Sequence, residues 1–201
     1  MTIQMERPTQ IDLTPPLDPP RLPQLHTWTR EEYDRMTERG LFDGQHVELI
    51  EGQVLEMAPM GSAHATAVGL AIEALRSLFG SGILIRGQMA LDLGALGQPE
   101  PDVAVVSGPV RKYQDQHPTG ALLVVEVAES SLAYDRTHKT RLYAQAGIAD
   151  YWLINLPDGQ LEVYRRPSPT GYAERTILRA GDVIHPLAAP HSGLRVADLL
   201  L

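Results

Sequence analysis

The sequence has 201 residues and a formal net charge of −8 with the histidines neutral. This acidic balance argues against a surface that coats nucleic acid over a broad area, because such coating depends on clustered cations. The sequence contains no cysteine, which excludes disulfides, thiolate metal sites and thiol nucleophiles within it. Any metal must therefore be held by oxygen or imidazole. Only two residues are lysines, Lys112 and Lys139.

The N-terminal segment differs in composition from the rest of the chain. Residues 1–24 hold six of the 16 prolines and show neither helical nor strand periodicity. Such a segment is typical of an extended arm, so we predict an arm over 1–24 and a single domain over 25–201. No apolar run approaches the ~18–20 residues that span a bilayer, and no signal sequence is evident. These features predict a cytoplasmic protein without a membrane partner.

Capping and turn residues predict the elements of the first half. Thr29 followed by Glu32 is a capping-box pattern for a helix over about 30–39. The pair Glu51-Gly52 predicts a tight hairpin turn between two strands. Apolar spacing then predicts a second long helix, followed by two more strands. The ranges are 46–50 and 53–57 for the hairpin, 62–79 for the helix, and 83–86 and 88–93 for the strands.

The second half alternates valine-rich strands with one helix. Runs of valine and leucine are typical of buried strands, and Gly147 ends the helical pattern. The predicted strands are 103–106, 122–127, 151–155, 161–164 and 172–178, with a helix over about 133–146. Residues 196–201 fit one helical turn or an edge strand. The element order predicts a mixed α/β fold with one central sheet flanked by helices.

Three acidic residues interrupt these apolar strands. Glu126 shares a strand face with Leu122 and Val124, because successive side chains alternate between faces. Asp102 opens the strand that follows Pro101, and Glu48 stands inside the first hairpin strand. Burying an unpaired carboxylate costs several kcal/mol. Each of these acids therefore needs a cation, a hydrogen-bond donor or a metal.

A lysine in the predicted helix faces the same sheet. Leu142, Tyr143 and Ala146 follow Lys139 at helical spacing, so Lys139 lies on the apolar stripe. One interpretation is an ordinary ion pair with Asp135, four residues earlier, which contributes only about 0.3–0.5 kcal/mol. The other interpretation joins Lys139 to the three acids. Carboxylates bind Mg²⁺ or Mn²⁺, and an ammonium group offsets charge that develops on a phosphate. We therefore predict a Mg²⁺ or Mn²⁺ site of Asp102 and Glu126, completed by Glu48, with Lys139 as the catalytic cation.

These residues resemble the PD-(D/E)XK nuclease superfamily and, within it, the Uma-two family of restriction-endonuclease-like proteins. The resemblance covers about residues 28–164. Its matching stretches are 47–52, His64, 101–106, 124–127, 134–143 and 146–154. The superfamily pattern places a lysine two residues after the glutamate, but Ala128 stands there. In the Uma-two branch the lysine lies in the following helix, at the place that Lys139 occupies.

The resemblance implies a restriction-endonuclease-like core with Asp102 and Glu126 as metal ligands and Glu48 as the acid of the preceding segment. It also implies a metal-dependent DNA endonuclease that forms a homodimer. His64 is a further candidate for an accessory role near the scissile phosphate, although such a histidine more often caps or packs. Tyr151 and Trp152 lie in a strongly apolar strand and are interpreted as core or dimer interface.

Two other function classes stay open at this point. A catalytically silent nuclease-like module would keep the same fold, bind metal or a partner, and show no divalent-dependent cleavage. A two-carboxylate glycosidase would work without metal, but the chain has only two tryptophans and two phenylalanines to line a sugar cleft. The glycine-containing segment around Gly94 and Gly97 lacks the lysine and hydroxyl residue of a phosphate-binding loop.

Overall fold

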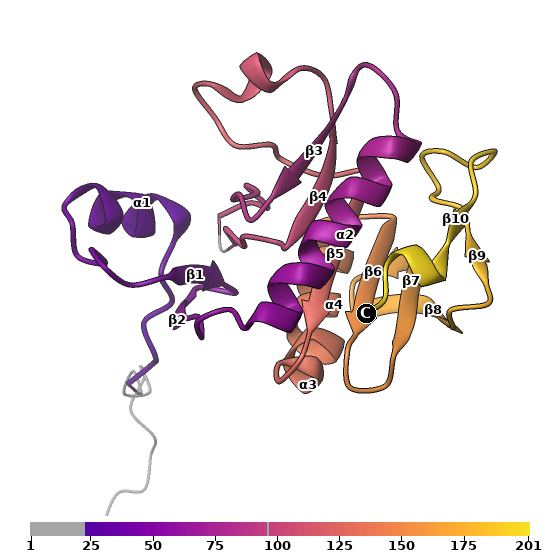
Figure 1. The fold of residues 1–201 in the computed structure, drawn as a ribbon. Helices are drawn as coiled ribbons and strands as arrows, with labels where there is room; N and C mark the ends of the chain where they lie inside the picture. The colour runs from indigo at the N-terminus through magenta and orange to yellow at the C-terminus, as the bar shows by residue number, and fades with distance from the viewer. Residues whose placement is uncertain (1–22, 96) are drawn as a thin grey trace, which may run out of the picture.

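The computed structural model describes residues 23–95 and 97–201, so most of the predicted arm lies outside the described residues. A six-stranded sheet in the order β3-β4-β5-β6-β7-β8 forms the centre of the molecule (Figure 1). Its strands are β3 (Ile83–Gly87), β4 (Val103–Ser107), β5 (Leu123–Ala128), β6 (Asp150–Asn155), β7 (Gln160–Ser168) and β8 (Gly171–Leu178). Strands β5 and β6 are parallel and the other neighbours are antiparallel. The predicted mixed α/β fold is confirmed.

Helices cover both faces of this sheet. Helix α2 (Ser62–Leu78) buries its stripe of Ala67, Ala71 and Leu75 against one face. The other face is covered by a helical segment that contains α3 (Leu132–Tyr134), a π-helix (Asp135–Lys139) and α4 (Thr140–Gln145). The sheet therefore separates two hydrophobic cores, and the alternation of side chains along β4 and β5 assigns each residue to one of them.

A small lobe precedes α2 and lies to one side of the sheet in Figure 1. It consists of α1 (Arg30–Glu38) and the hairpin of β1 (Val47–Ile50) and β2 (Gln53–Glu56). The predicted capping box at Thr29 and Glu32 is present. The predicted two-residue turn is also confirmed, with φ of 50° at Glu51 and 74° at Gly52. A side chain at Gly52 would collide with Thr27, so glycine is required there.

The lobe is fastened to the rest of the chain by a few polar contacts. The Gln98 N–H donates to the Leu49 carbonyl oxygen at 2.8 Å. Arg141, on α4, donates to both carboxylate oxygens of Glu51 at 2.6 and 2.5 Å. These contacts hold β1 next to the helical segment. They position Glu48, on β1, over the same sheet face.

Two sequence predictions need correction. Residues 88–93 are not a strand, because the chain takes a left-handed conformation at Gln88 (φ 48°) and leaves the sheet. The helix predicted over 133–146 contains a π-helical stretch in its middle, which apolar periodicity does not reveal. Of the two alternatives predicted for residues 196–201, the helical turn is confirmed, because Val196–Asp198 form a 3-10 turn. The short strands β9 (Val183–Ile184) and β10 (Leu194–Arg195) were not predicted.

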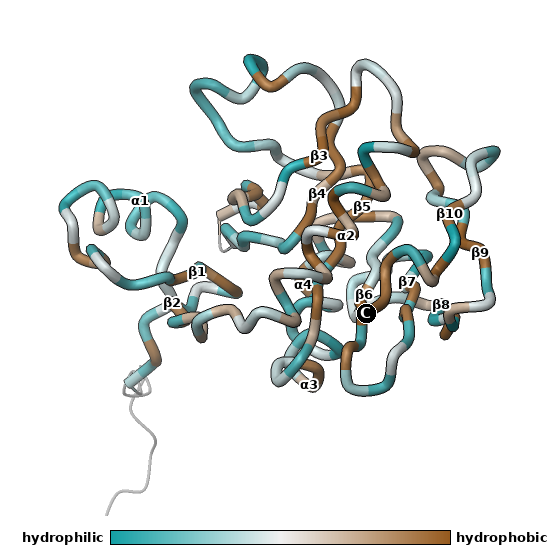
Figure 2. Tube along the Cα trace, in the orientation of Figure 1, coloured by the Kyte–Doolittle hydropathy of each residue, from teal (hydrophilic) through white to brown (hydrophobic). Residues whose placement is uncertain are grey.

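Hydropathy follows this architecture. Figure 2 shows hydrophobic residues concentrated along β3 and β4, whereas α1 is mostly hydrophilic. Tyr151 and Trp152 are fully buried in β6, so the core interpretation of these aromatic residues is confirmed. No helix within residues 23–95 and 97–201 combines the length and apolar character needed to cross a bilayer.

Candidate active site

Two carboxylates, Asp102 and Glu126, lie side by side where β4 and β5 stop pairing. The regular ladder between these strands ends at the Val103–Val125 pair. Beyond it, the Asp102 backbone N–H donates to Glu126 Oε2 at 3.1 Å, and the Val127 N–H donates to Asp102 Oδ2 at 2.8 Å. Each side chain thus satisfies an amide of the neighbouring strand. This exchange holds both carboxylates in defined positions at a buried strand end.

The second oxygen of Glu126 belongs to a buried ion cluster. Glu126 Oε1 accepts a hydrogen bond from the Tyr143 hydroxyl at 2.5 Å and lies 3.2 Å from Lys139 Nζ. Lys139 Nζ also donates to Glu48 Oε2 at 2.7 Å. Lys139 and Glu48 are each only 2% exposed. The lobe, the sheet and the helical segment therefore each contribute one charged group to a cluster shielded from solvent.

The second oxygen of Asp102 faces two other polar side chains. Asp102 Oδ1 lies 3.0 Å from Nε2 of His64, which stands in the first turn of α2. The hydrogen bond to Asp102 raises the pKa of His64, and burial opposes this rise. Gln88 Nε2 lies 3.4 Å from the same oxygen. The left-handed backbone of Gln88 carries a strain on the order of 1 kcal/mol.

Lys139 lies at the end of the π-helix, and Asp135 begins it. Both side chains are buried, but Asp135 accepts a hydrogen bond from Ser131 Oγ at 2.5 Å and has no ion pair with Lys139. The interpretation of Lys139 as the partner of Asp135 is therefore wrong. Burial alone lowers the pKa of Lys139, but the charges of Glu126 and Glu48 outweigh burial and raise it. Lys139 thus stays protonated at neutral pH.

The acids of this cluster outnumber its lysine. Burial raises the pKa of Glu126 to about 8, against the opposing charge of Lys139, and the charges of Asp102, Asp135 and Glu48 add to the increase. Burial likewise raises the pKa of Asp135 to about 6. Deprotonated carboxylates are costly here because negative charge is in excess. A bound cation would relieve this excess.

The donor set suits a hard divalent cation. Asp102 Oδ1 and Glu126 Oε1 are carboxylate oxygens from adjacent strands, and Mg²⁺ is commonly held by one or two carboxylates together with water and substrate phosphate. Within the described ranges, no three histidine, aspartate or glutamate side chains converge as a complete metal cage. Glu48 accepts a hydrogen bond from Lys139 instead. A role of Glu48 as the third ligand stays a prediction.

All of the residues that the sequence singled out lie in or beside this cluster. Sequence reasoning missed two further members, Tyr143 and Gln88. Tyr143 was placed on the buried stripe of the helix, but nothing in that pattern indicates that its hydroxyl binds a carboxylate. Gln88 follows Gly87 at the end of β3. The sequence analysis placed Gln88 in a predicted strand over 88–93, and that pattern gave no sign of a polar role. The predicted residues are Glu48, His64, Asp102, Glu126 and Lys139.

Comparison with known families identifies the family of this chain. Residues 30–197 match the model of the Uma2 (Uma-two) family, which is described as "Putative restriction endonuclease". The chain belongs to the Uma2 family. The match includes the lobe, both carboxylate-bearing strands and the helical segment, so every member of the candidate site falls inside the family region.

A solved structure shares the Uma2 chain's fold. It is described as a putative nuclease belonging to DUF820 from Anabaena variabilis, with a TM-score of 0.67 and 16% sequence identity. The similarity covers 85% of this chain and 96% of the other. The central mixed sheet flanked by helices that the sequence predicts is thus shared with this solved structure. The search of curated proteins found no match.

Proposed function

We propose that this Uma2 protein is a metal-dependent phosphodiester hydrolase, a DNA endonuclease that uses Mg²⁺ or Mn²⁺. The observation that carries the proposal is the buried arrangement of Asp102, Glu126 and Glu48 around Lys139, where burial and the neighbouring acids raise the pKa of Glu126 to about 8. In this proposal Asp102 and Glu126 hold the cation. Bound there, it would neutralise the phosphodiester and lower the pKa of a water molecule.

Lys139 is the catalytic cation in this proposal. Its ammonium group stays protonated, because Glu126 and Glu48 raise its pKa, so it does not act as a base. It can instead stabilise the negative charge that develops on the phosphate oxygens as water attacks phosphorus. Glu48 holds Lys139 in place through the 2.7 Å hydrogen bond. In this proposal His64, whose Nε2 lies 3.0 Å from Asp102 Oδ1, donates the proton to the leaving oxygen.

The test is a cleavage assay paired with calorimetry. Purified protein is incubated with single- and double-stranded DNA in Mg²⁺, in Mn²⁺ and in EDTA, and Mn²⁺ is titrated into wild type and Glu126→Gln. We expect EDTA-sensitive cleavage by the wild type and loss of both cleavage and the Mn²⁺ isotherm in Glu126→Gln. The matched control is Glu162→Gln, a buried position on the same sheet face. This variant should keep the Mn²⁺ isotherm once circular dichroism confirms that it is folded.

The outcomes separate an enzyme from a silent module. Mn²⁺ binding that depends on Glu126, without cleavage of any DNA, would identify a metal-binding interaction module instead. EDTA-resistant hydrolysis would point to a metal-free two-carboxylate mechanism. The proposal also includes a cytoplasmic homodimer, which rests on the sequence resemblance and is checked by sedimentation equilibrium of the full chain.

A further inference from the structure

Gln88 has a backbone conformation that its own packing does not explain. Its φ of 48° lies in the left-handed region that favours glycine, and its side chain is exposed, so no buried apolar contact compensates. Its N–H donates to the Asp102 carbonyl oxygen at 3.2 Å. A glycine would make the same backbone bond without strain. Backbone strain of this kind concentrates at functional sites. A strained glutamine in place of glycine there indicates that the glutamine side chain has a function.

The side chain of Gln88 is directed at the candidate site. In the register of β3 and β4, Gly87 pairs with Val103, so Gln88 comes next to Asp102 at the end of the ladder. Its Nε2 lies 3.4 Å from Asp102 Oδ1 and 3.8 Å from Met60 Sδ. Asp102 Oδ2 is occupied by a backbone amide. Gln88 therefore meets the other Asp102 oxygen, which also lies 3.0 Å from His64 Nε2.

We propose that Gln88 binds the substrate phosphodiester, with its side-chain N–H groups donating to a non-bridging phosphate oxygen. This inference rests on the proposed function. A neutral amide suits this position, because a lysine or arginine would pair with Asp102 and compete with a metal ion there. The amide has two N–H donors, so one can stay near Asp102 while the other reaches the phosphate. Gln88 is thus a substrate-binding residue beside the carboxylates.

The decisive variant is Gln88→Gly, which removes the amide and the strain together. We expect Tm to rise by about 2–4 °C, while kcat/KM for DNA cleavage falls about 10- to 100-fold, the loss expected for a hydrogen bond to a charged group. Affinity for a fluorescein-labelled DNA duplex in Ca²⁺ should fall in parallel. Gln88→Asn keeps an amide and tolerates the left-handed conformation, so it should recover part of the loss. The Kd for Mn²⁺ should stay within about twofold of wild type.

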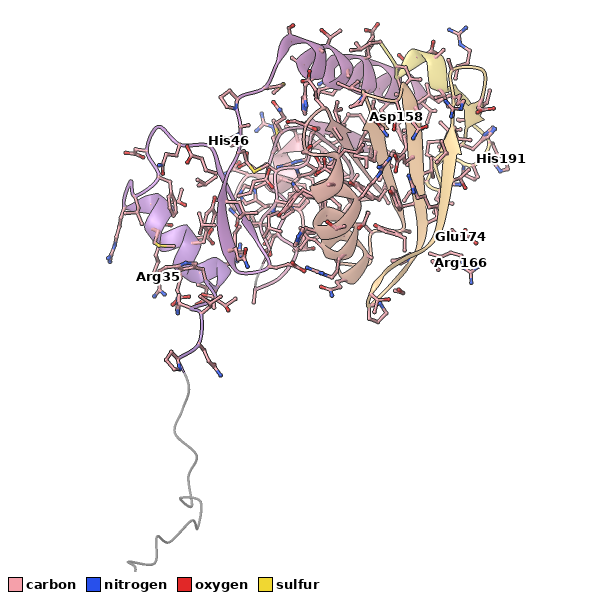
Figure 3. All side chains as sticks on the ribbon, turned by 90° about the horizontal axis from the view of Figure 1, so that it is seen from below. Arg35, His46, Asp158, Arg166, Glu174 and His191 are labelled. Carbon is pink, nitrogen blue, oxygen red and sulfur yellow. The ribbon has the colours of Figure 1, made fainter. Side chains whose placement is uncertain are left out.

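Arg166→Gly is the matched control, because Arg166 also has a left-handed backbone (φ 59°). Arg166 is 72% exposed, pairs with Glu174 on the neighbouring strand and lies across the molecule from His46 in Figure 3. This control should raise Tm without changing cleavage. If Gln88→Gly cleaves and binds DNA like wild type, the role of Gln88 is overturned and the proposed function stands. If wild type neither cleaves nor binds DNA, the proposed function fails and the role of Gln88 fails with it.

Discussion

Glu126 and Glu162 are both buried glutamates on one face of the central sheet, and they differ in what surrounds them. They lie in the same cross-strand row, because Leu153 of β6 pairs with Glu126 on one side and with Glu162 on the other. Two strand spacings, roughly 10 Å, separate them. The same helical segment reaches both, with Lys139 at Glu126 and Arg136 at Glu162.

The two environments drive the carboxyl pKa in opposite directions. Glu162 is fully buried, which by itself raises its pKa, but hydrogen bonds from Arg136, Tyr164 and Asn155 and the charge of Arg175 lower it to about 2. Burial raises the pKa of Glu126 to about 8, because its one lysine is shared with other acids and does not offset the cost of burial.

This contrast separates two uses of a buried acid. A carboxylate supplied with more donors than it needs fastens a helix to a sheet. A carboxylate left with an excess of negative charge around it is suited to bind a cation. The following predictions test whether Glu126 binds a cation and Glu162 serves the fold alone.

Lys139→Met should have the largest effect on function. If Lys139 stabilises the reacting phosphate as proposed, removal of its charge should lower cleavage about 10³-fold or more. The Mn²⁺ isotherm should remain, because Asp102 and Glu126 are intact. Since removal of one partner of a buried ion pair costs about 3–5 kcal/mol, urea unfolding must accompany the assay. Cleavage at the wild-type rate by the folded variant would remove Lys139 from the mechanism.

Glu48→Gln tests the remaining metal-ligand prediction. If Glu48 acts only through Lys139, the Kd for Mn²⁺ should change by no more than a few-fold, while cleavage falls about 10- to 100-fold because Lys139 loses its charged partner. Calorimetry at matched pH measures the first quantity and a plasmid-nicking assay the second. Loss of the Mn²⁺ isotherm would instead establish Glu48 as a ligand.

When no divalent cation is present, stability should fall at low pH because of Glu162 and at high pH because of Glu126. Glu162 has a folded pKa of about 2, below the usual value of 4.5. It therefore contributes about 3 kcal/mol above pH 4.5, and this contribution is lost as pH falls from 4.5 towards 2.

Glu126 has a folded pKa of about 8, above 4.5, so stability should decline by about 1 kcal/mol per pH unit as pH rises from 4.5 to 8. Urea unfolding in EDTA should therefore show a maximum near pH 5. Glu162→Gln should remove the loss of stability at acid pH. Glu126→Gln should remove the decline above pH 6, beyond the range in which Asp135, with a pKa of about 6, also contributes. Added Mg²⁺ should reduce only the decline in the free energy of unfolding at high pH. A lack of any effect of Mg²⁺ would argue against a cation at Glu126.

A pair of tyrosine-to-phenylalanine variants gives the smallest and most direct comparison. The Tyr143 hydroxyl donates to Glu126 at 2.5 Å, and the Tyr164 hydroxyl donates to Glu162 at 2.7 Å. Each substitution should cost about 1–2 kcal/mol of stability. Only Tyr143→Phe should weaken Mn²⁺ binding, by about 10-fold, because it loosens a ligand. Equal Mn²⁺ affinities in the two variants would show that Tyr143 has no role beyond folding.

Local patterns predicted much of the fold from the sequence. Capping, turn and apolar-period signals located α1, the β1-β2 hairpin, α2 and the strands of the central sheet, because these signals act within a few residues. They failed at Gln88 and within the π-helix. In both places the backbone departs from regular geometry where it meets residues distant in the sequence, and a local pattern carries no information about such contacts.

The membership of the candidate site was also largely predictable, since an acid inside an apolar strand must be compensated. That argument identified Glu126 and applies equally to Glu162 within its predicted strand at 161–164. It does not distinguish the two residues. Nor does it say whether Lys139 pairs with Asp135, four residues away, or with Glu48, from another element.

The sequence by itself thus determined which buried positions carry charge, because the period of a strand or helix fixes which side chains face inward. The tertiary structure alone decided what each charge meets. Glu126 meets one lysine and other acids, while Glu162 meets two arginines, because the lobe, the helical segment and β8 bring their side chains to the sheet from distant parts of the chain. The pKa of a buried carboxyl depends on burial and on those partners, so the contrast between Glu126 and Glu162 became visible only after folding had placed them.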